Sequence, residues 1–204
     1  GTVTAAESSD TDLFTVSRCG SDWDVTAKKA FSSAQTLKLT VDGTEYTIKV
    51  TDDSDNVAEV KTSSGTTEYP DFGTAMTAAG SVTASSVRLL ADTELPGNTY
   101  NITNYITLDL NGHTLTMADK KSLLYIGAGG SLTIKDSGTG GKITGGKTAY
   151  FIKVWGDNNA ATKEATLIVN GGTIENTYYD SSSTQIWNLL YSNVTITGGI
   201  FAGC

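Results

Sequence analysis

The chain has 204 residues and a mass of 21.3 kDa, which allows one sizeable core, or one core and a small appendage. Hydrophobic residues make up 38% and charged residues 18%, with 22 glycines and 33 threonines; this predicts many short strands with tight turns and argues against a helical bundle, a coiled coil or a disordered tail. The net charge of −8 argues against nucleic acid or an anionic membrane surface as a partner, because both need a basic face.

The beginning of the chain carries no targeting signal that we recognise. Gly1-Thr2-Val3-Thr4 lacks the charged and apolar segments of a signal peptide, and no run approaches the ~20 apolar residues of a membrane span. We expect the chain to be a piece of a longer protein. Cys19 and Cys204 have no neighbouring Cys or His at zinc-ligand spacing; the sequence leaves open whether they pair.

Residues 1–58 are expected to form a small β-rich region with a hairpin at 36–50. Apolar residues alternate with polar ones on both sides of Asp42-Gly43, which is a strong short-range signal for a hairpin turn. The segments Asp12–Val16 and Trp23–Thr26 are candidates for further strands. The role of this region is not indicated by its sequence.

A helix is predicted at residues 71–80. Asp71 is expected to be its N-cap and Gly80 to follow its last turn, in the C′ position. One stripe of the helix is apolar at helical spacing and is expected to face a core. The members of this stripe are Phe72, Ala75, Met76 and Ala79.

Beyond residue 86 a strand motif occurs four times, at intervals of 24, 35 and 27 residues, and a repeat at intervals of about 20–50 residues is typical of a solenoid. If one repeat makes one turn, equivalent strands stack in parallel at about 4.8 Å. We expect two inward ladders, formed by Leu110, Ile134, Val169 and Ile196 and by Leu108, Leu132, Leu167 and Val194. The residues between them, which are Asp109, Thr133, Ile168 and Thr195, are expected to point outward.

Two of these runs carry a resemblance to a known family. Ile106-Thr-Leu-Asp-Leu-Asn-Gly-His-Thr-Leu115, Leu132-Thr-Ile-Lys-Asp-Ser-Gly138 and the Ile-Thr-Gly-Gly turns resemble the pectate-lyase-like repeats of large secreted or cell-wall-attached bacterial proteins. The resemblance covers about residues 80–204 and implies an all-β, right-handed parallel β-helix at 59–204. Glu68–Leu90 resembles the short helix and first strand that cap such a solenoid. No cap is evident after the last repeat, so we expect truncation at that end.

The chemistry expected of an enzyme with this fold is not matched. Lyases of this family combine a Ca²⁺ site built from several carboxylates with an Arg or Lys base, whereas the residues equivalent to Asp109 are Thr133, Ile168 and Thr195. His113 belongs to an Asn-Gly-His turn, and we expect a structural hydrogen-bonding role for it. We therefore expect no catalytic residues, no metal and no cofactor. A polysaccharide lyase or hydrolase stays open as an alternative.

Aromatic residues crowd into the second half of the chain, flanked by Asn, Asp and Ser. Such a composition is typical of a binding surface, although the same rings could simply cover the flank or an end of the solenoid. The candidate binding residues are Tyr150, Lys153, Trp155, Asp157, Tyr178, Tyr179, Trp187 and Tyr191.

The resemblance implies a non-catalytic interaction module of a bacterial cell-surface or secreted protein. Such modules include adhesins and immunoglobulin-binding superantigens, so the expected partner is a host extracellular protein, with immunoglobulin as a candidate. A glycan-binding or polysaccharide-degrading domain is the first alternative and a structural stalk is the second. We expect an extracellular monomer that does not insert into a membrane.

Overall fold

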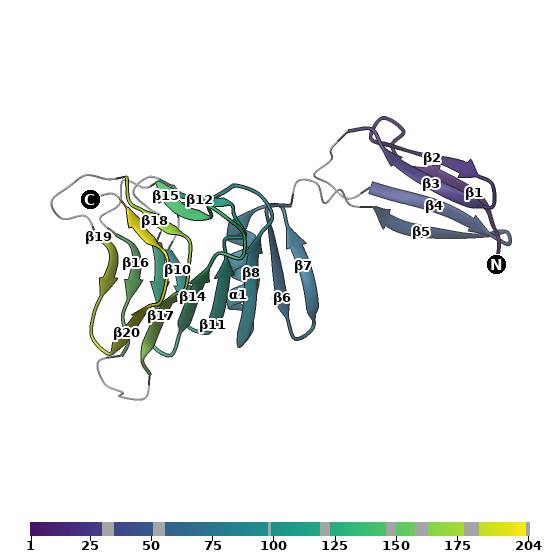
Figure 1. Ribbon diagram of the computed structural model, residues 1–204. Helices are drawn as coiled ribbons and strands as arrows, with labels where there is room; N and C mark the ends of the chain where they lie inside the picture. Colours follow the sequence, from purple (N-terminus) through teal and green to yellow (C-terminus); the bar gives the residue numbers. More distant parts are fainter. Residues whose placement is uncertain are drawn as a thin grey trace. The chain divides into compact units, whose positions relative to one another are not determined.

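The computed structural model describes residues 1–29, 35–50, 56–97, 99–118, 123–145, 150–157, 163–177 and 184–202. The chain divides into two compact units, unit 1 at Gly1–Asp55 and unit 2 at Asn56–Cys204, so the division falls just before the expected boundary at residue 58. Apart from one helix, the regular structure of the described residues is all β. Figure 1 shows the strands of each unit.

Unit 1 is formed by antiparallel strands. β1 pairs with β4 and β4 with β5, while β2 and β3 form a separate pair. Phe14 and Leu37 are its buried core residues. Cys19 is exposed and its thiol is free, whereas Cys204 lies outside the described residues. The strands are β1 (Val3–Ser8), β2 (Phe14–Cys19), β3 (Asp22–Ala27), β4 (Gln35–Val41) and β5 (Thr44–Val50).

The predicted hairpin is confirmed. β4 and β5 pair in register with Leu37 opposite Ile48, and Asp42 and Gly43 take φ angles of 48° and 82°. Two successive positive φ values are what a two-residue type I′ turn requires. The two further candidate strands correspond to β2 and β3, which both extend beyond the predicted ends, and β1 was not predicted.

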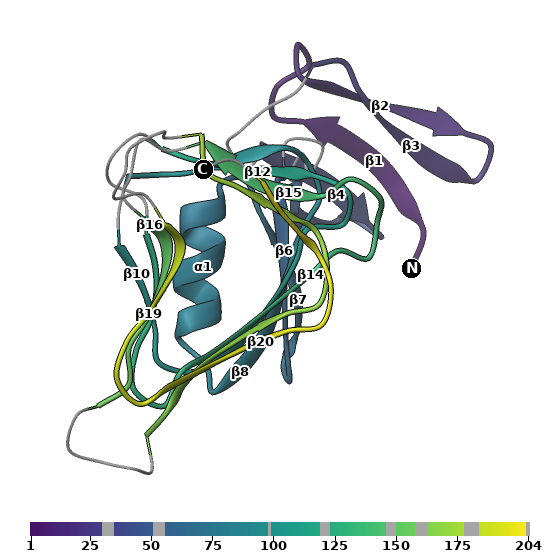
Figure 2. The same ribbon diagram turned by 60° about the vertical axis from the view of Figure 1, so that its left-hand side comes forward.

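Unit 2 contains three sheets that the chain visits in rotation, as Figures 1 and 2 show. From β8 onward, consecutive strands belong to the first, second and third sheet in turn, and neighbours within each sheet run parallel. The first sheet has the order β20-β17-β14-β11-β8-β6-β7, where β6 pairs antiparallel with both β7 and β8. The second has the order β21-β18-β15-β12-β9 and the third β10-β13-β16-β19.

The strands of the first sheet are β6 (Ala58–Thr62), β7 (Gly65–Tyr69), β8 (Ala84–Leu89), β11 (Tyr105–Asp109), β14 (Ser131–Lys135), β17 (Ala165–Val169) and β20 (Ser192–Ile196). Those of the second are β9 (Thr93–Leu95), β12 (Thr114–Met117), β15 (Lys142–Gly145), β18 (Thr173–Glu175) and β21 (Ile200–Ala202). Those of the third are β10 (Thr99–Ile102), β13 (Leu123–Ile126), β16 (Tyr150–Val154) and β19 (Thr184–Asn188).

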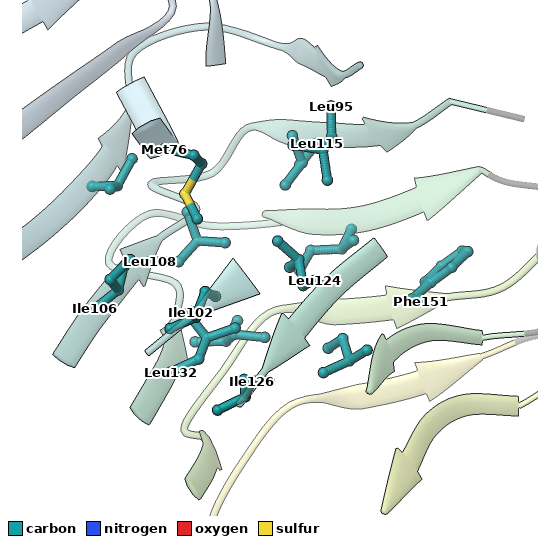
Figure 3. Packing of buried hydrophobic residues seen from close by; sticks show 14 of the residues in the cluster. Met76, Leu95, Ile102, Ile106, Leu108, Leu115, Leu124, Ile126, Leu132 and Phe151 are labelled. Carbon is teal, nitrogen blue, oxygen red and sulfur yellow. The ribbon is translucent and has the colours of Figure 1, made fainter. Parts of the chain in front are cut away.

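One continuous core fills unit 2, because alternate residues of every sheet point toward the other sheets. Met76, Leu108, Leu115 and Leu124, from α1 and from each of the three sheets, gather in it (Figure 3). Their exposed fractions are 3% or less. Full burial of such side chains contributes about 1.5–3 kcal/mol each, so this core is the main source of stability for the unit.

The stacked apolar ladders exist, but the predicted register was wrong for the first strand. Leu108, and not Leu110, lies opposite Ile134, which is followed by Val169 and Ile196. The adjacent ladder is Ile106, Leu132, Leu167 and Val194. Because side chains alternate with period two, a shift of two residues keeps the same side chains inside. Leu110 is still buried, just after the end of β11.

Asp109 is not the outward residue that was expected. It lies at the end of β11 and is only 4% exposed. Its carboxylate accepts hydrogen bonds from the backbone N–H groups of Asn111 and Ser137, at 3.1 and 2.9 Å, and pairs with Lys135 Nζ at 2.8 Å. Burial raises the pKa of this carboxyl, but the bonds from Lys135, Ser137 and Asn111 outweigh burial and hold the pKa below its ordinary 3.8.

The helix α1 (Phe72–Gly80) confirms the predicted helix, with Asp71 as its N-cap. The Asp71 carboxylate accepts from Thr74 N–H at 2.7 Å, and all four residues of the predicted stripe are buried. The predicted end was wrong, because Gly80 is the last helical residue and Ser81 is the C-cap. No helix within the described ranges has the length and apolar character needed to cross a membrane.

The apolar ladder gives a first test of this packing. Ile134 is fully buried, whereas Ile196, on the last described strand of the first sheet, is 53% exposed. We expect Ile134→Ala to lower the free energy of unfolding by about 2–5 kcal/mol and Ile196→Ala by less than about 1 kcal/mol. Urea denaturation of the chain measures both changes in the free energy of unfolding. Equal losses for the two variants would contradict the difference in burial between Ile134 and Ile196.

The buried Asp109 gives a second test. A folded-state pKa below the unfolded value of 3.8 stabilises the protein above that pH, and this stabilisation is lost as the pH falls through the folded-state pKa. We expect Asp109→Asn to cost about 2 kcal/mol at neutral pH and progressively less below the unfolded value. Urea denaturation from pH 7 to about pH 2.5 measures the difference in the free energy of unfolding between the unchanged protein and the variant. A difference that stays constant as the pH falls would contradict a lowered pKa of Asp109.

Candidate functional site

The outer face of the third sheet aligns four polar and aromatic side chains. The strand register places Asn101 of β10 opposite Tyr125 of β13, Tyr125 opposite Lys153 of β16, and Lys153 opposite Trp187 of β19. On the inner face of β16, Ile152 and Val154 are fully buried. Lys153 therefore points outward, because successive side chains of a strand alternate between its two faces.

Three rings surround the ammonium group of Lys153. Its Nζ atom lies 4.4 Å from the ring centroid of Trp155, 5.0 Å from that of Trp187 and 5.4 Å from that of Tyr125. All three distances are within the range of cation–π attraction, which contributes about 0.5–1 kcal/mol at exposed sites. We call Tyr125, Lys153, Trp155 and Trp187 the aromatic–lysine cluster.

Trp155 enters this cluster from just beyond the end of a strand. β16 ends at Val154, and the Trp155 N–H donates to the carbonyl of Ile126 at 2.9 Å. Trp155 is two residues after Lys153, so both lie on the outer side of the chain. Tyr125, Lys153 and Trp155 are half-buried, while Trp187 is 38% exposed, which leaves the cluster accessible from outside.

The charge environment of Lys153 differs from that of three other cations in unit 2. Lys135 pairs with Asp109, Arg88 with Glu59 at 3.5 Å, and Lys142 with Glu175 at 3.9 Å. Among the described residues, no carboxylate lies within ion-pair distance of Lys153. Aromatic rings, rather than an acid, therefore hold this ammonium group in place.

The structure brings together three of the eight predicted binding residues: Lys153, Trp155 and Trp187. Trp187 lies opposite Lys153 in the pairing of β16 with β19. Tyr150 begins β16, opposite Thr184. Tyr178 and Tyr179 lie outside the described residues.

Asp157 and Tyr191 are placed near, but not in, the cluster. Asp157 follows Trp155 by two residues, and its N–H donates to the carbonyl of Lys163 at 3.5 Å. Tyr191 lies between β19 and β20 with a φ of 50° and a ring that is 46% exposed. Its carbonyl accepts from the N–H of Ala165 at 3.1 Å, so its backbone fixes the turn.

Sequence reasoning missed Tyr125 and Asn101. The signal was present, because Leu124-Tyr125-Ile126 has the same alternation as Ile152-Lys153-Val154, and aligning these two segments places Tyr125 beside Lys153. The four recurring segments of the sequence centre on β11, β14, β17 and β20 of the first sheet, where the repeat is most regular. The strands of the third sheet lie outside these segments.

Two other features of unit 2 bear on the choice of site. A cavity of about 490 Å³ lies between α1 and β10, lined among others by Met76, Tyr100, Asn101 and Ile106; it includes none of the four cluster residues. Across the described ranges, no group of three His, Cys, Asp or Glu side chains could hold a metal ion. The aromatic–lysine cluster is therefore the strongest candidate site that the described residues present.

Comparisons with known proteins find no match: no family model, no curated protein and no solved structure is similar to this chain. What the site does must therefore be argued from its geometry.

The cluster itself can be tested by a double-mutant cycle. We expect Lys153→Met and Trp155→Leu to be coupled by about 0.5–1 kcal/mol in the free energy of unfolding, because each removes one side of the same cation–π contact. A matched cycle pairs Trp155→Leu with a change of Lys61, an exposed lysine of β6, to Met. Coupling of the same size in both cycles would show that the contact contributes nothing specific.

Proposed function

We propose that unit 2 is a right-handed parallel β-helix in which each group of three strands completes one coil. The rotation of consecutive strands through three parallel sheets supports this fold. The handedness rests on the general rule that connections between parallel strands are right-handed in nearly all proteins. The helix α1 and the β6–β7 hairpin lie at the first coil and suit the role of a cap, which a solenoid requires.

We propose that this chain is a non-catalytic interaction module of a bacterial cell-surface or secreted protein, and that it binds a host extracellular protein through the aromatic–lysine cluster. The observation that carries the proposal is the assembly of three rings around one half-buried cation on a sheet face. Trp and Tyr are enriched among the residues that dominate binding energy. A sheet backbone is ordered before binding, which lowers the entropic cost of association.

The arrangement of the acidic and basic groups supports a non-catalytic role. Asp136 accepts bonds from the N–H groups of Gly112, Gly138 and Gly141 at 2.7 to 3.2 Å, so both Asp136 and Asp109 are occupied in holding turns. Arg88 pairs with Glu59 and donates to Asn111 Oδ1 at 3.0 Å. His113 Nδ1 lies 3.5 Å from Asp92 at another turn.

Capture of a host protein tests this function. The purified chain is exposed to immunoglobulin G, and then to serum and mucus with identification of the bound protein by mass spectrometry. We expect the double variant Trp155→Ala/Trp187→Ala to weaken capture at least tenfold, because it removes two rings of the contact. The matched control is Tyr105→Ala, which removes a ring that is 60% exposed on β11 of the first sheet.

Two outcomes would reject this proposal. If the double variant captures the protein as well as the unchanged chain does, the binding surface lies elsewhere. If no protein is captured from any source, the proposal of a host-protein partner is rejected. The rings of Trp155 and Trp187 also suit stacking against sugars, so a polysaccharide panel is included. Binding of a glycan alone would favour the glycan-binding alternative, whereas release of unsaturated or reducing sugars would show catalysis.

A further inference from the structure

We propose that Lys153 is the recognition group for a carboxylate, supplied by an Asp or Glu side chain of the protein partner, and that the three rings of the cluster contact apolar side chains beside it. This inference rests on the proposed function, because it names the chemistry of the partner at the same site. The cation and the rings have separate roles in this inference, whereas the proposed function names only the cluster as a whole.

Charge complementarity points to an acidic group. Lys135, Lys142 and Arg88 each have an acidic partner within the chain, and among the described residues no ring cluster surrounds the unpaired Lys61 and Lys163. The Lys153 ammonium has no such partner among the described residues and is held by neutral rings instead. A partner that offers a carboxylate would therefore complete an ion pair that the described residues leave unmade.

The three rings prepare Lys153 for this role. A free lysine side chain carries about 2 kcal/mol of rotamer entropy, part of which is lost when it binds. Here the ammonium already lies 4.4 to 5.4 Å from three ring centroids. Part of the rotamer entropy of Lys153 is therefore lost during folding and not on binding. The rings also exclude water from one side of the ammonium, and an ion pair in such surroundings is stronger than one in bulk water.

The form of the site favours a protein surface as the source of the carboxylate. The cluster lies on the outer face of adjacent strands, which are about 4.8 Å apart, and Trp187 remains 38% exposed. A side chain that projects from a partner can reach Lys153 from outside. Its apolar neighbours can cover Trp155, Trp187 and Tyr125 at the same time, as in the centre of a protein interface.

Matched small probes test this inference independently of any captured protein. The intact chain is titrated with N-acetyl-Leu-Glu-Leu-amide and with its Gln counterpart, while nuclear magnetic resonance follows the Lys153 ammonium and the indole N–H groups of Trp155 and Trp187. We expect the acidic peptide to bind at least fivefold more tightly than the neutral one. Added salt should reduce the preference, because it screens the ion pair.

Variants separate the roles of the cation and the rings. We expect Lys153→Met to abolish the preference for the acidic peptide and Lys153→Arg to retain most of it, whereas Lys61→Met leaves it unchanged. Equal binding of both peptides, binding of neither, or a preference that survives Lys153→Met would overturn the inference. Glucuronate and glucose form a second matched pair, and a response to glucuronate without one to the acidic peptide would reject a protein source.

Failure of this inference and failure of the proposed function give different results. Discrimination between the two peptides without capture of any host protein would leave Lys153 as a carboxylate-recognition group and reject the host-protein assignment. Capture of a protein by an unchanged Lys153→Met variant would keep the proposed function and reject the role of Lys153.

Discussion

The in-register stacking of parallel strands is the constraint on which the rest of unit 2 depends. Leu108, Ile134 and Val169 lie directly opposite one another and are fully buried. Each strand pairs its backbone with the strands on both sides, and its apolar side chains meet equivalent side chains of the adjacent strands. Neither the core nor the outer surface can change register without disturbing the other, because both belong to the same strands.

The same stacking determines the chemistry of the turns. A Cβ atom at Gly130 would meet the carbonyl of Ile102, and one at Gly156 would meet the carbonyl of Tyr191, so glycine is required where successive turns approach this closely. At another turn, the carboxylates of Asp109 and Asp136 accept backbone N–H groups that the strands leave unpaired. Acidic residues here stabilise the fold, which is why their number does not indicate an active site.

The candidate site is the outer counterpart of the core. The register that stacks Leu124 on Ile152 inside the third sheet also stacks Tyr125 on Lys153, and Lys153 on Trp187, outside it. Lys153 and Trp187 could be selected from the sequence, because their alternation and aromatic setting are local signals. Tyr125 has the same alternation as Lys153, and the pairing of β13 with β16 sets the two side by side. Trp155 joins the cluster from just beyond the end of β16.

The sequence by itself determined the features that depend on a few neighbouring residues: the Asp42-Gly43 turn, the helix capped by Asp71, and which side of each strand is apolar. Tertiary structure alone decided that Leu108 and not Leu110 faces Ile134, that Asp109 is buried, and that three rings enclose Lys153. The physical reason is the period of a strand. A shift of two residues leaves the alternation unchanged along the chain, so only backbone pairing between distant segments can select the register.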